Sequence, residues 1–410
     1  MNSPLRAQSA RDGWNLLAYE ADRHAAKHRL VVGDIFACTP EEADRWVEVA
    51  GSEKIRVLEC QGEYAATALL MPMHQFFGGK RVQTRGAAGV GVLAPFRRDG
   101  VGSLLMAECL REMEAAGDAC ANLYASTTKL YRGVGYEMAG THYSATLETS
   151  YIPATRSDLE VRALSDADRP AMQAIVQANA ALAPGHLDRC GYIWPRLLRP
   201  RGKDAQAYGV FDSTGQMRGF LAFALEHGDD LDDFQRMTLH VFEAADAEGL
   251  QGLIALLRSH HSMVREMVTT LPPQSPIWTW LPEQRAKTRM REHFMLRIVR
   301  MADALQQRGY PLGMHADLVF EIDDPVLPAN QGFWRLQLSD GEPTVSKLDA
   351  MPNQACLHLR MDIGAFAALY SGHQPAENLA ILGRAEGTEA ALARASAAFA
   401  TRAVTCPEMF

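Results

Sequence analysis

Apolar residues are spaced in two ways along the chain, and each spacing predicts a different element. Apolar residues at every second position predict a half-buried strand, and apolar residues three or four positions apart predict a helix. In the first 150 residues these patterns predict helices at 11–28, 39–49 and 104–116, and strands at 55–60, 64–73, 90–92, 120–125 and 143–147. Helices mixed with largely antiparallel strands indicate an α/β (α+β) fold class.

The same layout of strand, loop and helix begins again after residue 150. It predicts strands at 159–164, 208–211, 217–225 and 236–241, and helices at 166–183 and 253–260. The last part has a different order of elements. Strands are predicted at 297–299, 316–322, 332–338 and 355–361, and helices at 301–307, 362–370 and 388–399. A sheet with helices packed on one side is expected there, and the chain divides into three domains, at 1–150, 151–295 and 296–410.

Composition and charge narrow the class of protein. Hydrophobic residues make up 47% of the chain and charged residues 22%, which is ordinary for a globular protein. A net charge of −8 argues against a nucleic-acid-binding surface, and it favours cationic small molecules as partners if the acidic groups gather near a cleft. The start of the chain is polar and no ~20-residue apolar stretch occurs, so neither a signal peptide nor a membrane span is expected.

The cysteines and histidines give no metal or redox motif. Seven cysteines lie far apart in the sequence, so free thiols in a reducing cytoplasm are expected. His24 and His28 stand four residues apart on the predicted first helix. Without a carboxylate or cysteine beside them we expect them on a solvated helix face, and no metal site is predicted.

The stretch from Val90 to Gly102 predicts a strand, a tight loop and the start of a helix. Val90 and Val92 alternate on one face, Pro95 cannot continue a central strand, and Gly100 and Gly102 loosen the loop before the helix. The free N–H groups at the start of a helix and the helix dipole favour an anion, and glycine lets it approach the backbone. Such a loop can hold a phosphate.

The pattern Arg97-x-x-Gly100-x-Gly102 resembles the pyrophosphate loop of the GNAT acetyltransferases, which bind acyl-CoA. The family's usual proline is displaced to Pro95, and an ordinary glycine-containing loop before a helix is the alternative. The resemblance implies that the strand offers backbone groups to the pantetheine arm of acetyl-CoA through Val90, Gly91 and Val92. It implies that the phosphates lie against Arg97, Arg98, Asp99, Gly100, Val101, Gly102 and Ser103.

A second motif follows at Ser126-Thr127, Tyr131 and Gly135-Tyr136. It resembles the GNAT element in which a serine ends a strand and a tyrosine five residues later points at the thioester sulfur. The resemblance implies that Ser126 and Thr127 line the cofactor site and that Tyr131 is the general acid. A phenol of pKa ~10 protonates a thiolate of pKa ~8.5 at a cost of ~2 kcal/mol. Aromatic packing is the alternative for Tyr131, and it is the expected role of Tyr136.

The second domain lacks an Arg-x-x-Gly-x-Gly pattern and has acids where phosphate would lie, so it is expected to be a GNAT-like domain that has lost CoA binding. The third domain resembles a sterol-carrier-protein-like domain. Together the order resembles the enhanced-intracellular-survival (Eis) family of amine acetyltransferases. That resemblance implies transfer of an acetyl group from acetyl-CoA to an amine in a ternary complex, no metal, and a homo-oligomer, a hexamer.

In the Eis family the terminal carboxylate takes part in catalysis, so Phe410 is the candidate base. Burial of this apolar end would raise the pKa of the α-carboxyl from its usual ~3.3–3.7 toward the working range. A frayed terminus is the alternative.

Eis family members often carry an acid just before the last residue, whereas this chain has Met409 there and Glu408 one position earlier, which weakens the case for aminoglycosides as substrates. A cationic amine (aminoglycoside-like, polyamine or lysine) is expected as substrate, attracted by Asp34, Glu408 or the 229–233 run. The alternative function is a lipid or hydrophobic-ligand binding protein that uses the GNAT scaffold without catalysis.

Overall fold

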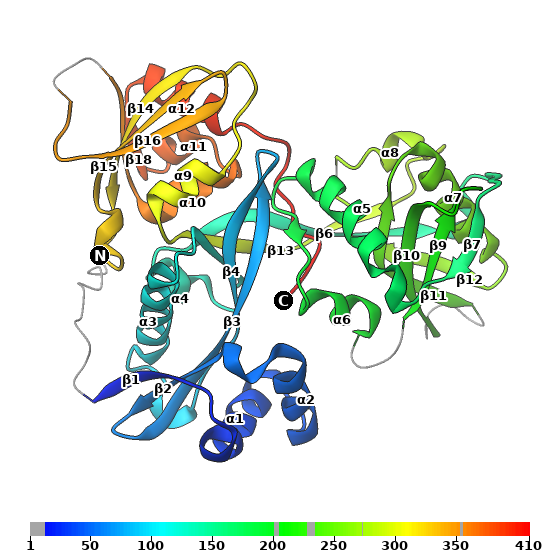
Figure 1. The fold of residues 1–410 in the computed structure, drawn as a ribbon, viewed down its shortest axis with the longest axis horizontal. Helices are drawn as coiled ribbons and strands as arrows, with labels where there is room; N and C mark the ends of the chain where they lie inside the picture. The colour runs from blue at the N-terminus through cyan, green and yellow to red at the C-terminus, as the bar shows by residue number, and fades with distance from the viewer. Residues whose placement is uncertain (1–12, 201–204, 228–233, 273, 353–355) are drawn as a thin grey trace. The chain divides into compact units, whose positions relative to one another are not determined.

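The computed structural model describes residues 13–200, 205–227, 234–272, 274–352 and 356–410. These residues form two compact units, which we describe separately. The first holds residues up to Gly140, then His293–Val404 and Met409–Phe410, and the second holds Thr141–Glu292 and Thr405–Glu408. Figure 1 shows the elements of both.

A twisted, mostly antiparallel sheet organises the N-terminal part of the first unit. Its strands follow the order β1 (Trp14–Ala18), β2 (Ile55–Cys60), β3 (Glu63–Phe77), β4 (Lys80–Val92), β5 (Cys120–Tyr124) and the C-terminal half of β13 (Lys287–Ile298). The strands β4 and β5 run parallel and pair only from Thr84 to Gly86 of β4, so the remaining length of β4 extends beyond the pairing with β5. The helices are α1 (Ala21–Phe36), α2 (Pro40–Ala50), α3 (Val101–Ala115) and α4 (Thr128–Arg132).

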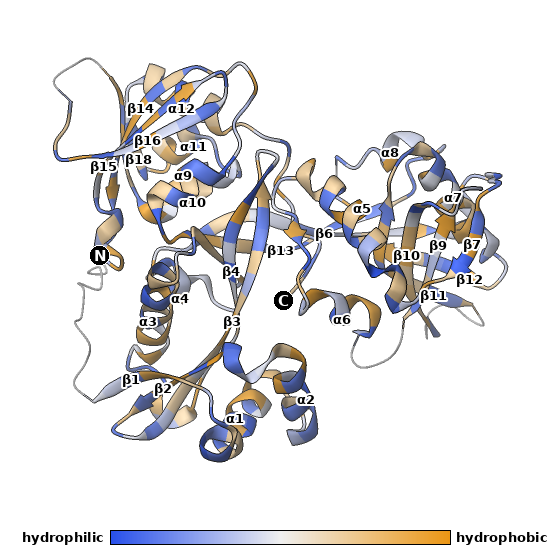
Figure 2. Cartoon of the chain, in the orientation of Figure 1, coloured by the Kyte–Doolittle hydropathy of each residue, from blue (hydrophilic) through white to orange (hydrophobic). Residues whose placement is uncertain are grey.

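The predicted cap of the second helix is confirmed. Thr39 accepts a hydrogen bond from the backbone N–H of Glu42, whose side chain accepts one from Thr39, and Pro40 occupies the first turn. The helices α1 and α2 carry both hydrophobic and hydrophilic residues along their length, as Figure 2 shows. Helix α3 buries one face, including Leu105, Cys109 and Met113, against the sheet.

The C-terminal part of the first unit has its own five-stranded sheet in the order β16 (Glu342–Leu348), β15 (Gly332–Ser339), β14 (Ala316–Asp323), β17 (Leu357–Asp362) and β18 (Ala385–Gly387). Its helices are α9 (Met301–Gln307), α10 (Ile363–Ser371), α11 (Ala376–Ile381) and α12 (Glu389–Phe399). The ring of Phe320 on β14 packs edge-on against Phe366 of α10 and Phe399 of α12, so both helices contact this strand.

The second unit has a mostly antiparallel sheet. Its order is β6 (Glu137–Glu148), β12 (Val264–Thr269), β11 (Gln235–Ala244), β10 (Met217–His227), β9 (Gln206–Phe211) and β7 (Glu160–Ala163). The remaining elements are α5 (Arg169–Ala181), β8 (Leu187–Asp188), α6 (Ile193–Leu198), α7 (Ala247–Ser259) and α8 (Ile277–Trp280). Apolar residues of α7 and β10 form one core cluster, and those of α5 and α6 form another.

Two predictions about the N-terminal region are wrong. Residues 11–28 do not form one helix, because Trp14–Ala18 is a strand that pairs with β2 and α1 begins at Ala21. His24 and His28 are not on a solvated face but are both buried. The His24 ring pairs with Glu59 at 3.1 Å, and the His28 ring contacts the Tyr64 hydroxyl at 3.0 Å. Within the described residues no cluster of metal-ligating side chains occurs.

Several short elements were not predicted, among them β12, β16, α11 and β18. The seven cysteines are free; three of them are buried and the others are partly exposed. No helix in the described part of the chain is both long and apolar enough to span a bilayer.

Candidate functional site

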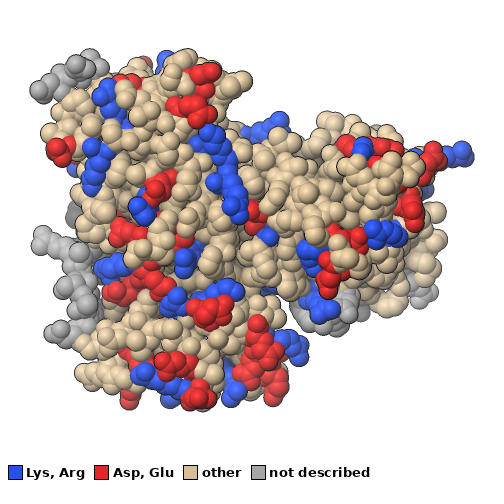
Figure 3. Space-filling view, in the orientation of Figure 1, with Lys and Arg blue, Asp and Glu red and all other residues tan. Residues whose placement is uncertain are grey.

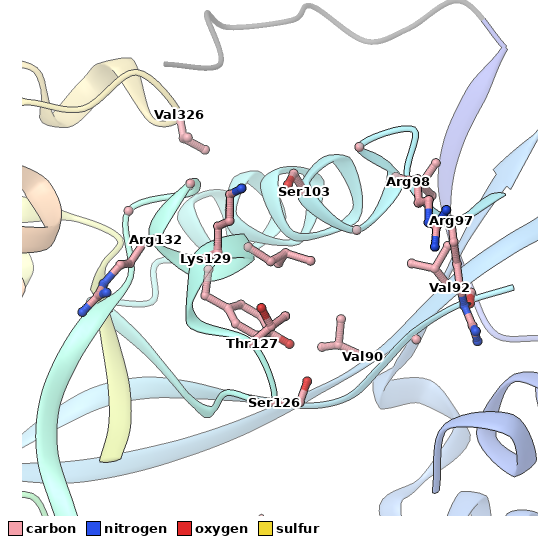
Figure 4. Close-up of a pocket in the computed structure, with 18 of the residues that line it drawn as sticks. Val90, Val92, Arg97, Arg98, Ser103, Ser126, Thr127, Lys129, Arg132 and Val326 are labelled. Carbon is pink, nitrogen blue, oxygen red and sulfur yellow. The ribbon is translucent and has the colours of Figure 1, made fainter. Parts of the chain in front are cut away.

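A cavity of about 1400 Å³ lies in the first unit, between the end of β4, the start of α3, helix α4 and a loop of the C-terminal sheet. Figure 4 shows its labelled side chains. Tyr131 and all the predicted cofactor-binding residues except Asp99 line it. Among its described lining residues, Phe410 does not occur. Residues from two sequence motifs that are more than twenty positions apart therefore share one cavity.

The loop before α3 holds its backbone in an unusual conformation. Arg98 and Gly100 both have φ of 77°, in the left-handed region. Glycine adopts this region freely, whereas an arginine there is strained by ~1–2 kcal/mol. Helix α3 starts after Gly100 without a side-chain cap among the described residues, so the N–H groups of its first turn remain available to an anion.

Arg97 is held by the protein itself. Its Nε donates a hydrogen bond to the Val92 carbonyl at 2.9 Å, and its terminal nitrogen forms an ion pair with Asp34. Both charged groups are about half exposed, at 45% and 55% of their side-chain surface, so the pair contributes little to stability. Asp34 is thus a partner of Arg97 in this structure.

The corresponding helix of the second unit starts differently. Asp246 caps α7 by accepting a hydrogen bond from the Gly249 N–H at 2.9 Å, and it forms an ion pair with Arg218. A Cβ atom at Gly249 would collide with the Arg218 carbonyl, so the backbone of β10 lies directly against the helix start. The position that an anion would need is occupied by the protein's own carboxylate and backbone.

Tyr131 is buried on α4, with 5% of its surface exposed. Burial raises the pKa of its phenol to about 12. Its backbone carbonyl accepts hydrogen bonds from the N–H groups of Val134 and Tyr136, and its ring packs edge-on against Tyr136 at 6.0 Å. Tyr136 is fully buried, and its hydroxyl has no hydrogen-bond partner among the described residues. The turn after α4 therefore fixes the position of Tyr131.

A buried ion pair that the sequence analysis did not identify supports this turn. Arg297 of β13 donates from Nε to the Val134 carbonyl at 2.9 Å and makes two hydrogen bonds to Asp324, at 2.6 and 2.8 Å. Neither side chain is exposed. Asp324 also accepts hydrogen bonds from the N–H groups of Val326 and Leu327, which orders the loop that lines the cavity. Nothing in the local sequence marks residues this far apart as partners.

The end of the chain is ordered in both units. The Phe410 ring packs edge-on against Tyr124 of β5 at 5.6 Å and lies 3.1 Å from a Cβ built at Gly86 of β4. Gly86 is the last residue of β4 that pairs with β5, so the terminal ring covers the point where the two strands separate. In the second unit Glu408 is buried, 3% exposed, and accepts a hydrogen bond from Arg189 at 2.6 Å.

These contacts change the set of candidate amine-attracting groups. The prediction that Glu408 attracts an amine is wrong, since its carboxylate is buried and is held by Arg189, which also pairs with Glu243. The acidic run at 229–233 lies outside the described residues. On the face seen in Figure 3, acidic and basic side chains are interspersed, so attraction of a cation has to be local.

A smaller cavity of about 600 Å³ opens on the C-terminal sheet. Charged side chains line it, including Glu321, Asp323, Arg360 and Glu386. A lipid-binding cavity is instead lined mainly by apolar side chains. This site does not favour the alternative of a lipid-binding protein.

Three domain families match the chain. Two are acetyltransferase (GNAT) domains, at residues 21–139 and 185–298, and the third is a sterol carrier protein domain, at residues 301–407. An uncharacterized N-acetyltransferase of Streptomyces coelicolor is 27% identical over 349 residues, which covers 78% of this chain and 79% of the relative.

Solved structures match over the whole length. A GCN5-related N-acetyltransferase from Anabaena variabilis is 27% identical with a TM-score of 0.90, covering 97% of this chain and 100% of that one. Eis1 from Mycobacterium abscessus has a TM-score of 0.76 at 20% identity over 97% of this chain and 100% of its own, which shows a shared fold.

These matches confirm the predicted fold class, with two GNAT domains followed by a sterol carrier protein domain. They also show that the chain is an enzyme, an acyltransferase that uses acetyl-CoA and acts on amines. The chain belongs to the GNAT N-acetyltransferases and has the Eis-type arrangement of domains.

Proposed function

We propose that the large cavity of the first unit is the acetyl-CoA site and that the enzyme acetylates a cationic small-molecule amine in a ternary complex. The observation that carries the proposal is the convergence of the uncapped start of α3, two arginines and a buried tyrosine on one cavity. In this arrangement Arg97, Arg98 and the first turn of α3 bind the pyrophosphate. From Val90 to Val92, β4 pairs with β3 but not with β5, and in this proposal it offers the edge facing β5 to the pantetheine arm, with Ser126 and Thr127 lining the same path.

Tyr131 acts as the general acid in this proposal. The amine nitrogen attacks the thioester carbonyl, the carbon–sulfur bond breaks, and the leaving thiolate takes a proton from the phenol. With a pKa of about 12, the phenol transfers its proton to a thiolate of pKa ~8.5 at a cost of about 5 kcal/mol. This cost is larger than the ~2 kcal/mol for an unperturbed tyrosine, so Tyr131 stabilises the sulfur first as a hydrogen-bond donor.

The α-carboxylate of Phe410 is the proposed base. It takes a proton from the incoming ammonium group, so that the free amine can attack. The packing of the Phe410 ring on Tyr124 supports this role, because it anchors the terminus beside the strand that leads to Ser126. A frayed terminus would not make such a contact. The nearby carboxylate of Glu408 is not proposed as the base, because it is buried and paired with Arg189.

The second GNAT domain is proposed to bind no acyl-CoA, since Asp246 and the β10 backbone occupy the start of α7. The domain limits at 1–150, 151–295 and 296–410, the cytoplasmic location and the homohexamer remain predictions. Light scattering tests the hexamer, and a monomer would contradict it.

Calorimetry with acetyl-CoA tests the proposed site directly. We expect one binding site per chain, and we expect it to be weakened when Arg97 and Arg98 are both replaced by glutamine. No binding to the unmodified protein would refute the proposal. Binding that is unaffected by the double replacement would place the cosubstrate elsewhere.

A further inference from the structure

The cavity has two ends with different side chains. Figure 4 places Arg97 and Arg98 at one end, and Lys129, Arg132 and Val326 toward the other. The second end is built jointly by α4 and by the C-terminal domain, which contributes Val326 and Arg384 to the lining. The loop motif accounts for the first end only.

Helix α4 lies close to the start of α3. The Leu130 side chain approaches to 2.7 Å from a Cβ built at Gly102, so a larger residue at this point of the first turn of α3 would displace Leu130. Lys129 precedes Leu130 on α4, and in Figure 4 its side chain extends between Ser103 and Val326. Its ammonium group therefore lies at the second end of the cavity, on the side of Ser103 in the first turn of α3.

The cations at this end differ in whether they are already neutralised. Arg132 donates to Glu137 at 2.7 and 3.0 Å. Arg384 donates to Asp362 at 2.8 Å and also pairs with Glu137. Lys129 is exposed and has no carboxylate partner among the residues that the structure describes. It is the cation at this end whose charge is left for a ligand.

The chemistry of CoA supplies a matching anion. CoA carries a 5′-pyrophosphate and, separately, a phosphate on the 3′ oxygen of its ribose. Building on the proposed acetyl-CoA site, we propose that Lys129 binds the 3′-phosphate and that Val326 of the C-terminal domain forms the wall beside it. The third domain would then take part in choosing the cosubstrate, because acyl groups carried on pantetheine without a 3′-phosphate lack this contact.

The test compares acetyl-CoA with acetyl-3′-dephospho-CoA, which differs only in that phosphate. The unmodified enzyme should show a KM about tenfold higher for the dephospho compound, a difference of about 1.4 kcal/mol. Lys129→Gln should raise the KM for acetyl-CoA by the same factor and leave the KM for the dephospho compound unchanged. Lys129→Arg should restore the preference. Arg97→Gln is the matched control, because it should raise both KM values.

A carboxylate added at the wall tests the part of the third domain. Val326→Glu should raise the KM for acetyl-CoA more than that for the dephospho compound, since repulsion acts on the 3′-phosphate.

If Lys129→Gln raises the KM for both compounds equally, Lys129 contacts the pyrophosphate and the proposal is overturned. If it changes neither KM, Lys129 does not contact the cosubstrate, and the proposal is overturned as well. An unmodified enzyme that binds both compounds equally would also overturn it, while leaving the acetyl-CoA site intact. If calorimetry shows no binding of acetyl-CoA at all, the proposed function fails as well.

Discussion

Replacing Arg98 by glycine should weaken acetyl-CoA binding without weakening the fold. Arg98 has φ of 77°, a conformation that glycine adopts without strain. Its side chain is exposed and lines the cavity beside the start of α3. The same substitution therefore removes a cation from the proposed phosphate site and removes strain from the backbone.

The two effects can be estimated separately. Relief of the left-handed conformation stabilises the folded chain by ~1–2 kcal/mol, and the extra freedom of glycine in the unfolded chain offsets ~0.5–1 kcal/mol of that. The net change is between about 0 and +1.5 kcal/mol in the free energy of unfolding. Loss of a hydrogen bond from a charged group to phosphate weakens binding by ~1.5–3 kcal/mol, or roughly 10- to 100-fold.

The assay combines thermal unfolding with steady-state kinetics. Arg98→Gly should have a Tm at or above that of the unmodified enzyme and a KM for acetyl-CoA at least tenfold higher. Gln61→Gly is the matched control, because Gln61 also has a positive φ, of 51°, but lies in the turn between β2 and β3 and does not line the cavity. Gln61→Gly should also have a Tm at or above that of the unmodified enzyme, and its KM for acetyl-CoA should be unchanged.

Either half of the result can refute the reasoning. An unchanged KM in Arg98→Gly would remove Arg98 from the phosphate site. A clear fall in Tm would show that contacts of the Arg98 side chain stabilise the folded chain by more than its left-handed backbone conformation destabilises it.

Four further predictions follow from the same site. Tyr131→Phe should keep acetyl-CoA affinity and lower kcat by ~10²–10⁴, whereas Tyr136→Phe, which removes a buried hydroxyl without a partner, should keep activity and stability; full kcat in both would refute the acid. Because burial raises the pKa of Tyr131 to about 12, the acid stays protonated as pH rises, and a loss of kcat/KM that tracks its deprotonation near pH 10 would contradict this. Extending the chain beyond Phe410 should abolish turnover while acetyl-CoA still binds, and equal rates for C-terminally and N-terminally tagged enzymes would exclude the carboxylate. Asp34→Asn should lower the KM for acetyl-CoA by up to about fivefold by releasing Arg97, and a higher KM would show that their pair orders the loop.

Short-range patterns predicted the parts of the site that are built from neighbouring residues. The strand, loop and helix start around Gly100 and the position of Tyr131 after a strand both follow from local spacing. The same reasoning was wrong for 14–18, where helical spacing in the sequence was outweighed by pairing with β2. It was also wrong for His24, because its buried partner Glu59 lies 35 residues away.

The support that Arg297 and Asp324 give to the site could not be predicted from the sequence either, because it also depends on contacts between residues far apart in the chain. Arg297 contacts a carbonyl 163 residues earlier in the chain, and Asp324 is 27 residues further on. Ion pairs of this kind depend on the folded positions of three separate segments, and a lone arginine in a strand gives no sign of them. Only the fold shows that the turn after Tyr131 is held by the strand that leads into the third domain.

The two GNAT domains show why a repeated fold does not repeat a binding site. Both have a helix start in the corresponding place, but α3 begins after Gly100 with no side-chain cap from the part of the chain that the structure describes, and α7 begins after Asp246, which caps it. A capping carboxylate uses the same N–H groups and the same dipole as a bound phosphate, so the two compete for one position. Replacing Asp246 with glycine would still leave the Arg218 backbone against Gly249 and supply no arginine pair. Loss of the site in the second domain is therefore distributed over the cap, the strand packing and the loop, and one substitution cannot reverse it.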